Sequence, residues 1–182
     1  MEEEFNQNLI ILDVDGVQAN LVDVVEAHVL EKYGKPLNKD VFDLGLSQDE
    51  WEEIVTNKHL FESAKPYPGV KEVIDSLKEK GMYIWSITAR RVPTSTTILW
   101  MKKYNIYFDR LETRSNEERI ELVKQERPLL YVDDKFENVY KSCGFVKYPI
   151  IVERPWNFLY NPKIIRIQSL SQLMDFLEGS DG

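Results

Sequence analysis

The sequence contains one cysteine, no long hydrophobic run and no excess of basic residues. Because Cys143 has no second cysteine to pair with, an internal disulfide framework is excluded, and we expect a reducing compartment, the cytoplasm. The longest apolar runs, such as residues 9–12, fall far short of the roughly 18 residues of a membrane span. The chain begins Met-Glu-Glu-Glu, which is acidic where a secretory signal is basic and then apolar. We therefore expect no membrane partner.

The charge balance is acidic, because 23 Lys and Arg stand against 31 Asp and Glu and leave a formal charge of −8. Proteins that coat nucleic acids or lipid surfaces draw much of their affinity from Lys and Arg, so this balance argues against both partners. A hydrophobic fraction of 43% with 12% aromatic residues excludes a disordered chain. The length of 182 residues suits one domain with a small insertion.

Short apolar runs alternate with helical patterns along the chain. Each run is nearly continuous in hydrophobicity, as expected for strands that are covered on both faces. Helices of about a dozen residues between parallel strands form right-handed crossovers, so we predict an α/β fold, a Rossmann-like three-layer sandwich with a mostly parallel sheet. The predicted strands are Leu9–Val14, Met82–Ile87, Leu129–Val132, Ile150–Glu153 and Ile164–Ile167.

The predicted helices begin at recognisable signals. Ser and Glu or Gln spaced three residues apart predict capping boxes, and proline favours the first turn of a helix. The capping boxes are Ser47 with Glu50, Ser115 with Glu118 and Ser169 with Gln172, and the prolines are Pro68 and Pro93.

One stretch interrupts the alternation, because residues 19–65 have room for two or three helices where a crossover needs only one. We interpret residues 19–65 as a small helical cap placed over the end of the first strand. The remaining residues, 1–18 and 66–182, are then the α/β core domain.

An acidic pair follows the first strand. Asp13 and Asp15 lie where open α/β sheets bind ligands, and their side chains share a direction if the chain stays extended. Like charges that close raise each other's pKa unless a cation or proton lies between them, and Mg²⁺ is the usual hard cation beside phosphate. The pair also supplies a nucleophile, Asp13, and a proton donor or acceptor, Asp15. The alternative interpretation is a polar turn, which Asp and Gly16 also favour.

Two later strand ends carry similar signals. Thr88 follows the second strand, where its hydroxyl can donate to a phosphoryl oxygen and nearby amides, such as that of Ala89, can add to the cradle. Thr88 is equally suited to capping the next helix. Asp133 and Asp134 follow the third strand, and we predict that at least one of them is a further metal carboxylate, although one could cap a helix.

These residues resemble, in order and spacing, the haloacid dehalogenase-like phosphohydrolases. The resemblance extends from about Asn8 to Phe176. The family pattern also includes a basic residue ahead of the strand that ends at the Asp133-Asp134 pair. Within that superfamily the chain is similar to the 5′(3′)-deoxyribonucleotidase group, cytosolic type C. The segments that carry this similarity are Asp13-Val-Asp-Gly-Val17, Phe61 with Pro66-x-Pro68-Gly69, Thr113-Arg114, Asp133-Asp134-Lys135 and Arg154-Pro155-Trp156-Asn157.

The resemblance implies a mechanism. Asp13 attacks phosphorus to form an aspartyl-phosphate, and Asp15 protonates the leaving alcohol and then activates water. Mg²⁺ is bound by the Asp13 carboxylate, the Asp15 backbone carbonyl and one carboxylate of the later pair, for which Asp134 matches better than Asp133. Thr88 hydrogen-bonds the transferring phosphoryl group, where positioning and electrostatics dominate catalysis.

The basic residue departs from the family pattern, which commonly has a lysine. The predicted helix after Ser115 offers Arg119 and Lys124, and their spacing of five residues turns them to different sides of a helix. We favour Arg119 as the catalytic residue because a guanidinium can pair bidentately with phosphate and carboxylate. Either side chain could instead be a solvated helix charge.

A nucleotidase cap needs aromatic or apolar groups that stack a base. Leu21 and Phe61 are the predicted substrate-binding residues of the cap, with Phe42 and Trp51 as further candidates. Leu21 stands at the position that resembles an aromatic in the nucleotidases. The aromatics are also suited to packing the cap.

Arg90 is predicted to contact phosphate or ribose, and alternatively balances an acidic site. Trp156 either borders the pocket or covers the sheet edge.

We therefore predict a Mg²⁺-dependent phosphatase of a small phosphomonoester, most plausibly a nucleoside monophosphate. A second reading keeps the chemistry and changes the substrate to a sugar phosphate or a nucleic-acid terminal phosphate. A third reading is a non-catalytic, phosphorylatable, metal-binding switch module. The Asp133-Asp134 pair at the end of a strand and the inserted cap oppose this third interpretation, because receiver domains have neither.

Overall fold

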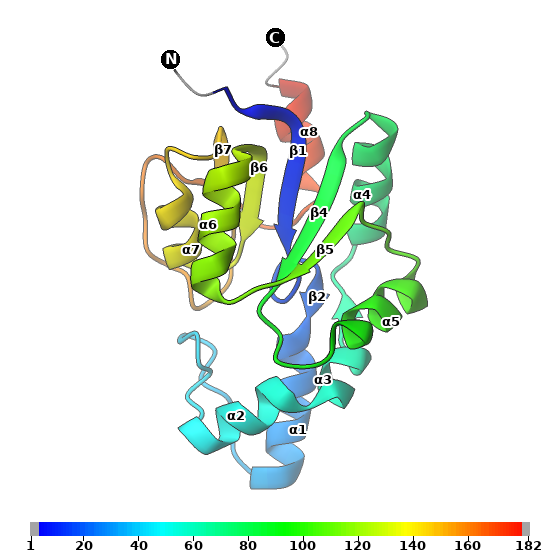
Figure 1. Ribbon diagram of the computed structural model, residues 1–182. Helices are drawn as coiled ribbons and strands as arrows, with labels where there is room; N and C mark the ends of the chain where they lie inside the picture. The colour runs from blue at the N-terminus through cyan, green and yellow to red at the C-terminus, as the bar shows by residue number, and fades with distance from the viewer. Residues whose placement is uncertain (1–3, 180–182) are drawn as a thin grey trace.

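A computed structural model describes residues 4–179 of the chain and shows a six-stranded parallel sheet (Figure 1). The strand order is β5-β4-β1-β6-β7-β8, so β1 lies between β4 and β6. All neighbouring pairs are parallel, so the carboxyl ends of the strands meet at one edge. The strands are β1 Asn6–Asp13, β4 Tyr83–Thr88, β5 Arg110–Thr113, β6 Pro128–Asp133, β7 Tyr148–Val152 and β8 Ile165–Ile167.

Helices cover both faces of the sheet and form the outer layers of the sandwich. Alternate residues of β1 divide between the faces: Ile10 and Leu12 pack with α4, α5 and α8, whereas Leu9 and Ile11 pack with α6. Val139 of α7 packs with Ile151 on the face that α6 covers. This confirms the predicted three-layer α/β fold. The helices are α4 Val70–Glu79, α5 Thr94–Tyr104, α6 Asn116–Glu126, α7 Phe136–Ser142 and α8 Gln172–Gly179.

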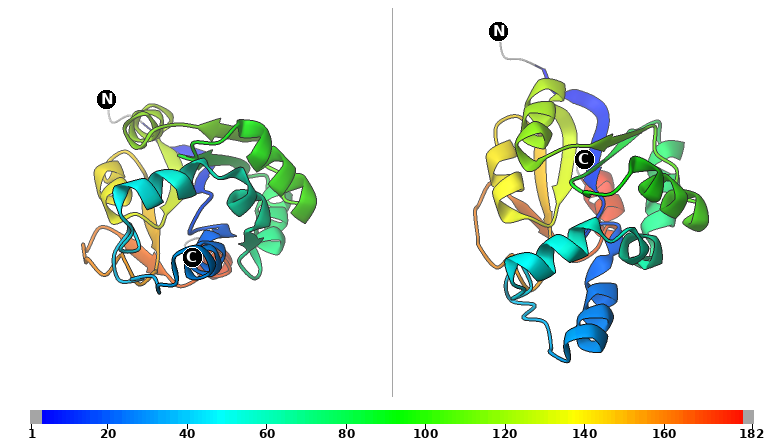
Figure 2. Two further views of the ribbon diagram at one scale, coloured as in Figure 1. Left: turned by 90° about the horizontal axis from the view of Figure 1, so that it is seen from below. Right: turned by 60° about the horizontal axis from the view of Figure 1, so that its bottom comes forward.

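The insertion after β1 lies across the carboxyl edge of the sheet (Figure 2). It contains α1 Leu21–Tyr33, α2 Gln48–Thr56 and α3 Lys58–Ser63. Two short strands, β2 Ala19–Asn20 and β3 Lys65–Pro66, pair antiparallel where the chain leaves the core and returns to it. Val25, Val29, Ile54 and Leu60 form the small hydrophobic core of the insertion. We call the segment from β2 to β3 the cap.

Several elements differ from the prediction in extent. Strands β2, β3 and β5 were not predicted, and β1 begins at Asn6 rather than Leu9. The capping boxes at Ser47 and Ser115 are both present. At the start of α8 the Gln172 side chain accepts from the Gln168 backbone N–H at 2.6 Å, so it reaches one residue beyond the predicted partner Ser169.

Among the described residues, every helix is too short or too polar to cross a lipid bilayer. The outermost residues of the predicted core domain, 1–3 and 180–182, and with them most of the acidic start of the chain, lie outside the described residues.

Candidate active site

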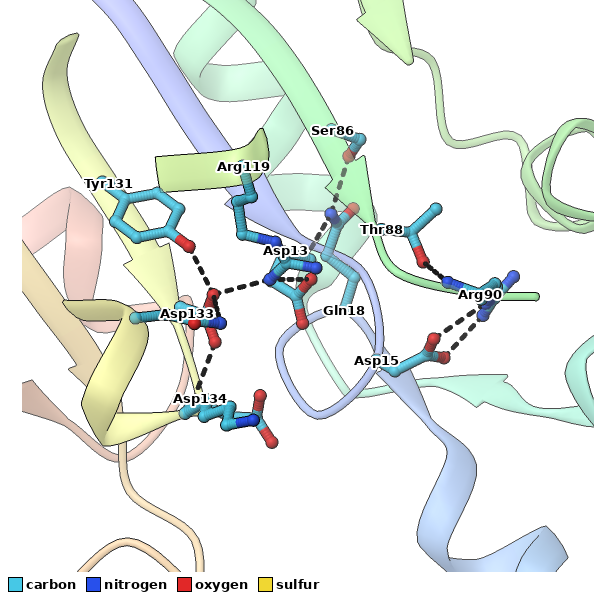
Figure 3. A network of polar contacts seen from close by, with 12 residues as sticks. Asp13, Asp15, Gln18, Ser86, Thr88, Arg90, Arg119, Tyr131, Asp133 and Asp134 are labelled. Carbon is cyan, nitrogen blue, oxygen red and sulfur yellow. Dashed lines mark hydrogen bonds and ion pairs between the residues drawn. The ribbon is translucent and has the colours of Figure 1, made fainter. Parts of the chain in front are cut away.

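The site forms where three neighbouring strands end. Asp13 is the last residue of β1, Thr88 the last of β4 and Asp133 the last of β6. Because β1 runs between β4 and β6, Asp13 lies at the centre with Thr88 and Asp133 on either side (Figure 3). Ligands of open α/β sheets bind outside the carboxyl ends of strands, which is the edge that the cap covers here.

Three carboxylates converge at this edge. Asp13, Asp133 and Asp134 are all buried, and each offers an oxygen that lies within 4.8 Å of the other two. Burial raises the pKa of Asp13 well above its ordinary value, and the charges of the neighbouring acids raise it further. Burial and the charge of Asp133 likewise raise the pKa of Asp134 to about 8. The cluster is therefore a site that favours a bound cation.

Asp133 is held firmly from several elements. Its Oδ2 accepts hydrogen bonds from Arg119 Nη1 at 2.7 Å, from Asn138 Nδ2 at 3.0 Å and from the Tyr131 hydroxyl. Its Oδ1 accepts from the Lys135 backbone N–H at 2.8 Å. With four donors, Asp133 orders the surrounding groups, and its lone pairs are largely engaged.

Asp134 lies against the loop that follows β1. Gly16 in this loop has a φ of +81°, and a Cβ at this position would lie 2.1 Å from Asp134 Oδ2. Only glycine allows both the left-handed backbone and this close approach. On its other side, Asp134 Oδ2 accepts from Trp156 Nε1 at 3.1 Å, and its backbone oxygen accepts from Asn157 Nδ2 at 2.7 Å.

The donor set fits a hard divalent cation. Carboxylate oxygens are the ligands that Mg²⁺ prefers, and one cation would offset the mutual repulsion that raises the pKa values of Asp13 and Asp134. The missing Cβ at Gly16 also lets the Asp134 carboxylate lie against the loop that follows Asp15. Asp13 and Asp134 have fewer protein donors than Asp133, so they are the carboxylates best placed to turn an oxygen toward an ion.

Arg119 and Lys124 occupy different environments. The buried Arg119 guanidinium places Nη1 2.8 Å from Asp13 Oδ1 and 2.7 Å from Asp133 Oδ2, so one nitrogen bridges both acids. Lys124 lies on the outer side of α6, where its Nζ pairs with Glu121 at 2.9 Å. The structure thus brings Arg119 to the acidic cluster and leaves Lys124 at the surface.

Asp15 lies apart from the three clustered acids. Its carboxylate accepts two hydrogen bonds from Arg90, with Nε at 2.8 Å and Nη2 at 2.7 Å. The Arg90 side chain is only 1% exposed, whereas that of Asp15 is 24% exposed. Figure 3 shows the Asp15 carboxylate turned toward the Arg90 guanidinium.

Backbone contacts fix the start of the loop after β1. Gln18 is fully buried, and its amide nitrogen Nε2 donates to the Asp13 backbone oxygen and to Ser86 Oγ, both at 2.8 Å. Thr88 is buried at the end of β4, where its Oγ1 accepts from the Arg90 backbone N–H at 3.2 Å. The Ala89 residue between them borders the cleft described next.

A cleft of about 430 Å³ lies between this edge of the core and the cap. Its floor is polar and contains the acidic cluster with Arg119, whereas its wall on the cap side is apolar. Leu21 and Phe61, both predicted to bind substrate, line the cleft, and Phe61 is 2% exposed. The other apolar cap residues of the wall are Val22, Val25, Phe42, Leu44, Trp51, Ile54 and Val55.

Several residues of the site were missed or left open by the sequence. Gln18, Tyr131 and Asn138 were not predicted, although Tyr131 and Asp133 are two residues apart on a strand and so share a face. Trp156 was predicted either to border the pocket or to cover the sheet edge. The structure shows the first of these, because Trp156 borders the cleft and packs against the cap core.

Comparison with known proteins places the chain among distant relatives. It is 27% identical over 142 residues to "Putative nucleotidase YqfW" of Bacillus subtilis, covering 75% of this chain and 73% of that protein. It is 25% identical over 168 residues to "Putative nucleotidase BH1399" of Halalkalibacterium halodurans, covering 86% of this chain and 85% of that protein. No family model matches the sequence.

Solved structures share the fold at low sequence identity. A haloacid dehalogenase-like hydrolase, SP0104 of Streptococcus pneumoniae, matches with a TM-score of 0.66 and 14% identity over 94% of this chain and 98% of its own. A structure described as a β-phosphoglucomutase of Thermotoga maritima matches with a TM-score of 0.62 and 15% identity over 95% and 99%. The predicted resemblance is therefore confirmed: the chain has the haloacid dehalogenase-like fold and is distantly homologous to the two nucleotidase-named proteins.

Proposed function

We propose that this protein is a cation-dependent phosphatase that hydrolyses a small phosphomonoester through an aspartyl-phosphate on Asp13. The observation that carries the proposal is the position of Asp13. It lies at the floor of the cleft beside a bridging arginine and two further buried acids. The charge of Arg119 opposes the rise in the pKa of Asp13 that burial causes, and positive charge also stabilises the charge that develops on a transferring phosphoryl group.

In the first step, an Asp13 carboxylate oxygen forms a bond to phosphorus while the bond from phosphorus to the ester oxygen breaks. The departing alcohol oxygen takes the proton of the Asp15 carboxyl, which faces the cleft. Arg119, Thr88 and the backbone amide of Ala89 are proposed to hold the phosphoryl oxygens. The products of this step are the free alcohol and an aspartyl-phosphate.

In the second step, the Asp15 carboxylate takes a proton from water as the water oxygen bonds to phosphorus. The bond between phosphorus and the Asp13 oxygen then breaks. Inorganic phosphate leaves, the Asp13 carboxylate is restored and Asp15 is protonated again. The net reaction is the hydrolysis of one ester bond.

We assign the cation site to Asp13, Asp134 and the backbone carbonyl of Asp15, with Asp133 as the residue that orients the cluster. Mg²⁺, when bound, neutralises charge on the phosphoryl oxygens and lowers repulsion between substrate and acids. The residues themselves do the remaining work: Arg119 holds Asp13, and Trp156 and Asn157 hold Asp134.

A nucleoside monophosphate is the substrate class that the cleft favours. The floor is charged and the cap wall is apolar and aromatic, which suits a ligand with a phosphate at one end and a flat ring at the other. The names of the two distant relatives agree with this class. A sugar phosphate lacks the flat ring, and a nucleic-acid terminus would meet the acidic surface of a chain with a net charge of −8. The single thiol suits a reducing compartment such as the cytoplasm.

The test is phosphate release from p-nitrophenyl phosphate with Mg²⁺. We expect steady turnover that EDTA abolishes, and a loss of at least about 10⁴-fold in Asp13→Asn, since the carboxamide is no nucleophile. Asp175→Asn, on an exposed position of α8, is the matched control and should keep full activity. Ordinary turnover by a folded Asp13→Asn variant would refute the nucleophile, and a single stoichiometric phosphorylation without turnover would favour the switch module.

A panel of nucleoside monophosphates, sugar phosphates and 3′-phosphorylated oligonucleotides then tests the substrate class. We expect kcat/KM to be highest for nucleoside monophosphates. A flat response across the panel would remove the nucleotidase assignment and leave the phosphatase assignment intact.

A further inference from the structure

We infer that Arg90 is a positioning residue for Asp15. Arg90 holds the Asp15 carboxyl in place for proton transfer and does not itself contact the substrate. This inference rests on the proposed function, because it gives Asp15 the role of the proton donor and acceptor. It differs from the first expectation from the sequence, in which Arg90 contacts phosphate or ribose, and extends the alternative, in which Arg90 balances an acidic site.

Each nitrogen of the Arg90 guanidinium makes a hydrogen bond to a protein group. Nε and Nη2 form a parallel pair of hydrogen bonds with the two oxygens of Asp15, and Nη1 donates to Thr97 Oγ1 at 3.1 Å. Each of its three nitrogens therefore donates to an oxygen of the protein. A bidentate arginine–carboxylate pair fixes the plane of the carboxylate as well as its distance.

Aromatic rings hold the guanidinium from the cap and from the core. Arg90 Cζ lies 4.8 Å from the centre of the Phe61 ring of α3 and 5.8 Å from that of the Trp100 ring of α5. Trp100 is itself fixed, because its Nε1 donates to the Ala64 backbone oxygen at 2.7 Å. Arg90 itself lines the cleft. The ring contacts stabilise its cation and leave the side chain little freedom to exchange Asp15 for a ligand.

If Arg90 positions Asp15, the effect of losing Arg90 should depend on how much the leaving group needs a proton. Alcohols with a high proton affinity leave as neutral molecules only if Asp15 is correctly placed, whereas p-nitrophenolate leaves as an anion without a proton. Loss of Arg90 should therefore slow the first step more for an ester with a poor leaving group. A residue that binds the phosphoryl group directly would affect both esters alike.

The experiment compares phenyl phosphate with p-nitrophenyl phosphate, which share a shape and differ in the leaving group. In single-turnover reactions of Arg90→Ala with Mg²⁺, we expect release of phenol to slow about 10²-fold and first-turnover release of p-nitrophenol to slow less than about tenfold. Added guanidinium ion at a non-denaturing concentration should restore part of the lost rate. Orthovanadate should raise the unfolding temperature of the variant as much as that of the wild type, because the phosphoryl site is intact.

Two further variants complete the test. Arg110→Ala is the matched control: Arg110 also pairs with a carboxylate, Glu112, and stacks on an aromatic ring, that of Trp85 at 4.4 Å, but it lies on the edge strand β5. It should leave both rates unchanged. If Arg90→Ala fails to fold, Arg90→Lys keeps the charge and loses the bidentate geometry, and should show the same dependence on leaving group.

Three outcomes would overturn the inference. Equal slowing of both esters with a weakened vanadate effect would make Arg90 a substrate ligand. Equal slowing with an unchanged vanadate effect and no rescue by guanidinium would make it a structural residue only, and unchanged rates would remove any role. If the wild type released neither phenol nor p-nitrophenol, the proposed function itself would fail, and this inference would fail with it.

Discussion

The floor of the cleft and the cap that covers it differ in how deeply their ion pairs are buried. On the floor, Asp13, Asp133 and Arg119 are buried, and the Nη1 atom of Arg119 contacts one carboxylate oxygen of each acid. The ion pairs of the cap are more exposed than this, and so is the Arg91–Glu52 bridge between core and cap, whose side chains are 59% and 41% exposed. Buried charges are costly to leave unpaired, whereas exposed pairs contribute little. Under the proposed function, the chemistry therefore depends mainly on the floor, and the cap reaches it through Phe61 beside Arg90.

The sharpest test of this contrast compares two basic residues of α6. Arg119→Ala leaves two buried acids without their shared partner, so we expect a loss of about 3–5 kcal/mol in unfolding free energy and a fall in kcat. Lys124→Ala, at the surface, should change stability by less than about 0.5 kcal/mol. Thermal and denaturant unfolding with phosphate-release assays measure both. Similar losses in the two variants would contradict the contrast, and Arg119→Lys should show whether charge alone is sufficient.

Mg²⁺ should stabilise the floor and leave the cap pairs unaffected. At about 100 times its Kd, a ligand that binds only the folded state adds about 2.7 kcal/mol, which corresponds to a rise of about 5–10 °C in the unfolding temperature of a chain of this size. Asp134→Asn should abolish this rise.

The same substitution should raise the unfolding temperature in EDTA, because burial and the charge of Asp133 raise the pKa of Asp134 to about 8 and the amide carries no charge. A full Mg²⁺ effect in Asp134→Asn would place the ion elsewhere.

A substitution in the wall should change substrate choice and spare the chemistry. The Phe42 ring lies 4.5 Å from Lys135 Nζ and 6.2 Å from the ring of Trp51, and its residue is 43% exposed. We expect Phe42→Ala to raise KM for a nucleoside monophosphate by about tenfold, since stacking on a base contributes about 1–3 kcal/mol. Turnover of p-nitrophenyl phosphate should stay the same. Exposed Phe158 offers a matched control, and equal losses on both substrates would make Phe42 part of the fold only.

The smallest effect concerns the acid sensitivity of the cap. Hydrogen bonds from Lys32, Tyr33 and His28 of α1 lower the pKa of Glu53 in α2 from 4.5 to about 2. Because the folded pKa is depressed, the stabilisation is present above pH 4.5 and is lost as the pH falls toward about 2. Thermal unfolding of Glu53→Gln should depend less on pH in that range than the wild type. Glu31→Gln, on an exposed position of α1, should keep the wild-type dependence.

Local signals in the sequence were sufficient for the frame of the sheet and for the acids at its edge. The apolar runs of the predicted strands overlap β1, β4, β6, β7 and β8, with ends that differ by one or more residues, because buried parallel strands have few polar residues. β5 was missed because Arg110-Leu-Glu-Thr113 is an edge strand with exposed charges, which reads as a loop. β2 and β3 have two residues each, and their pairing depends on the return of the chain.

Contacts between distant residues could not be predicted in the same way. Asp15 and Arg90 are 75 residues apart, and nothing in either segment indicates that the guanidinium turns to Asp15 rather than to the cleft. The bridge from Arg119 to Asp133 spans 14 residues and follows from a helix that packs on the end of β6. Predicting such pairs requires knowledge of the tertiary packing. The type of residue at each strand end can be read from the sequence alone.

The indole of Trp156 has a consequence for anyone who studies this molecule in solution. It touches the acidic cluster through its nitrogen and the hydrophobic centre of the insertion through its rings, so a single chromophore borders both halves of the cleft. Events at either half alter the polarity around it. The protein thus carries an intrinsic optical probe for ion uptake and ligand binding, which variants of Trp51, Trp85 and Trp100 would isolate from the other indoles.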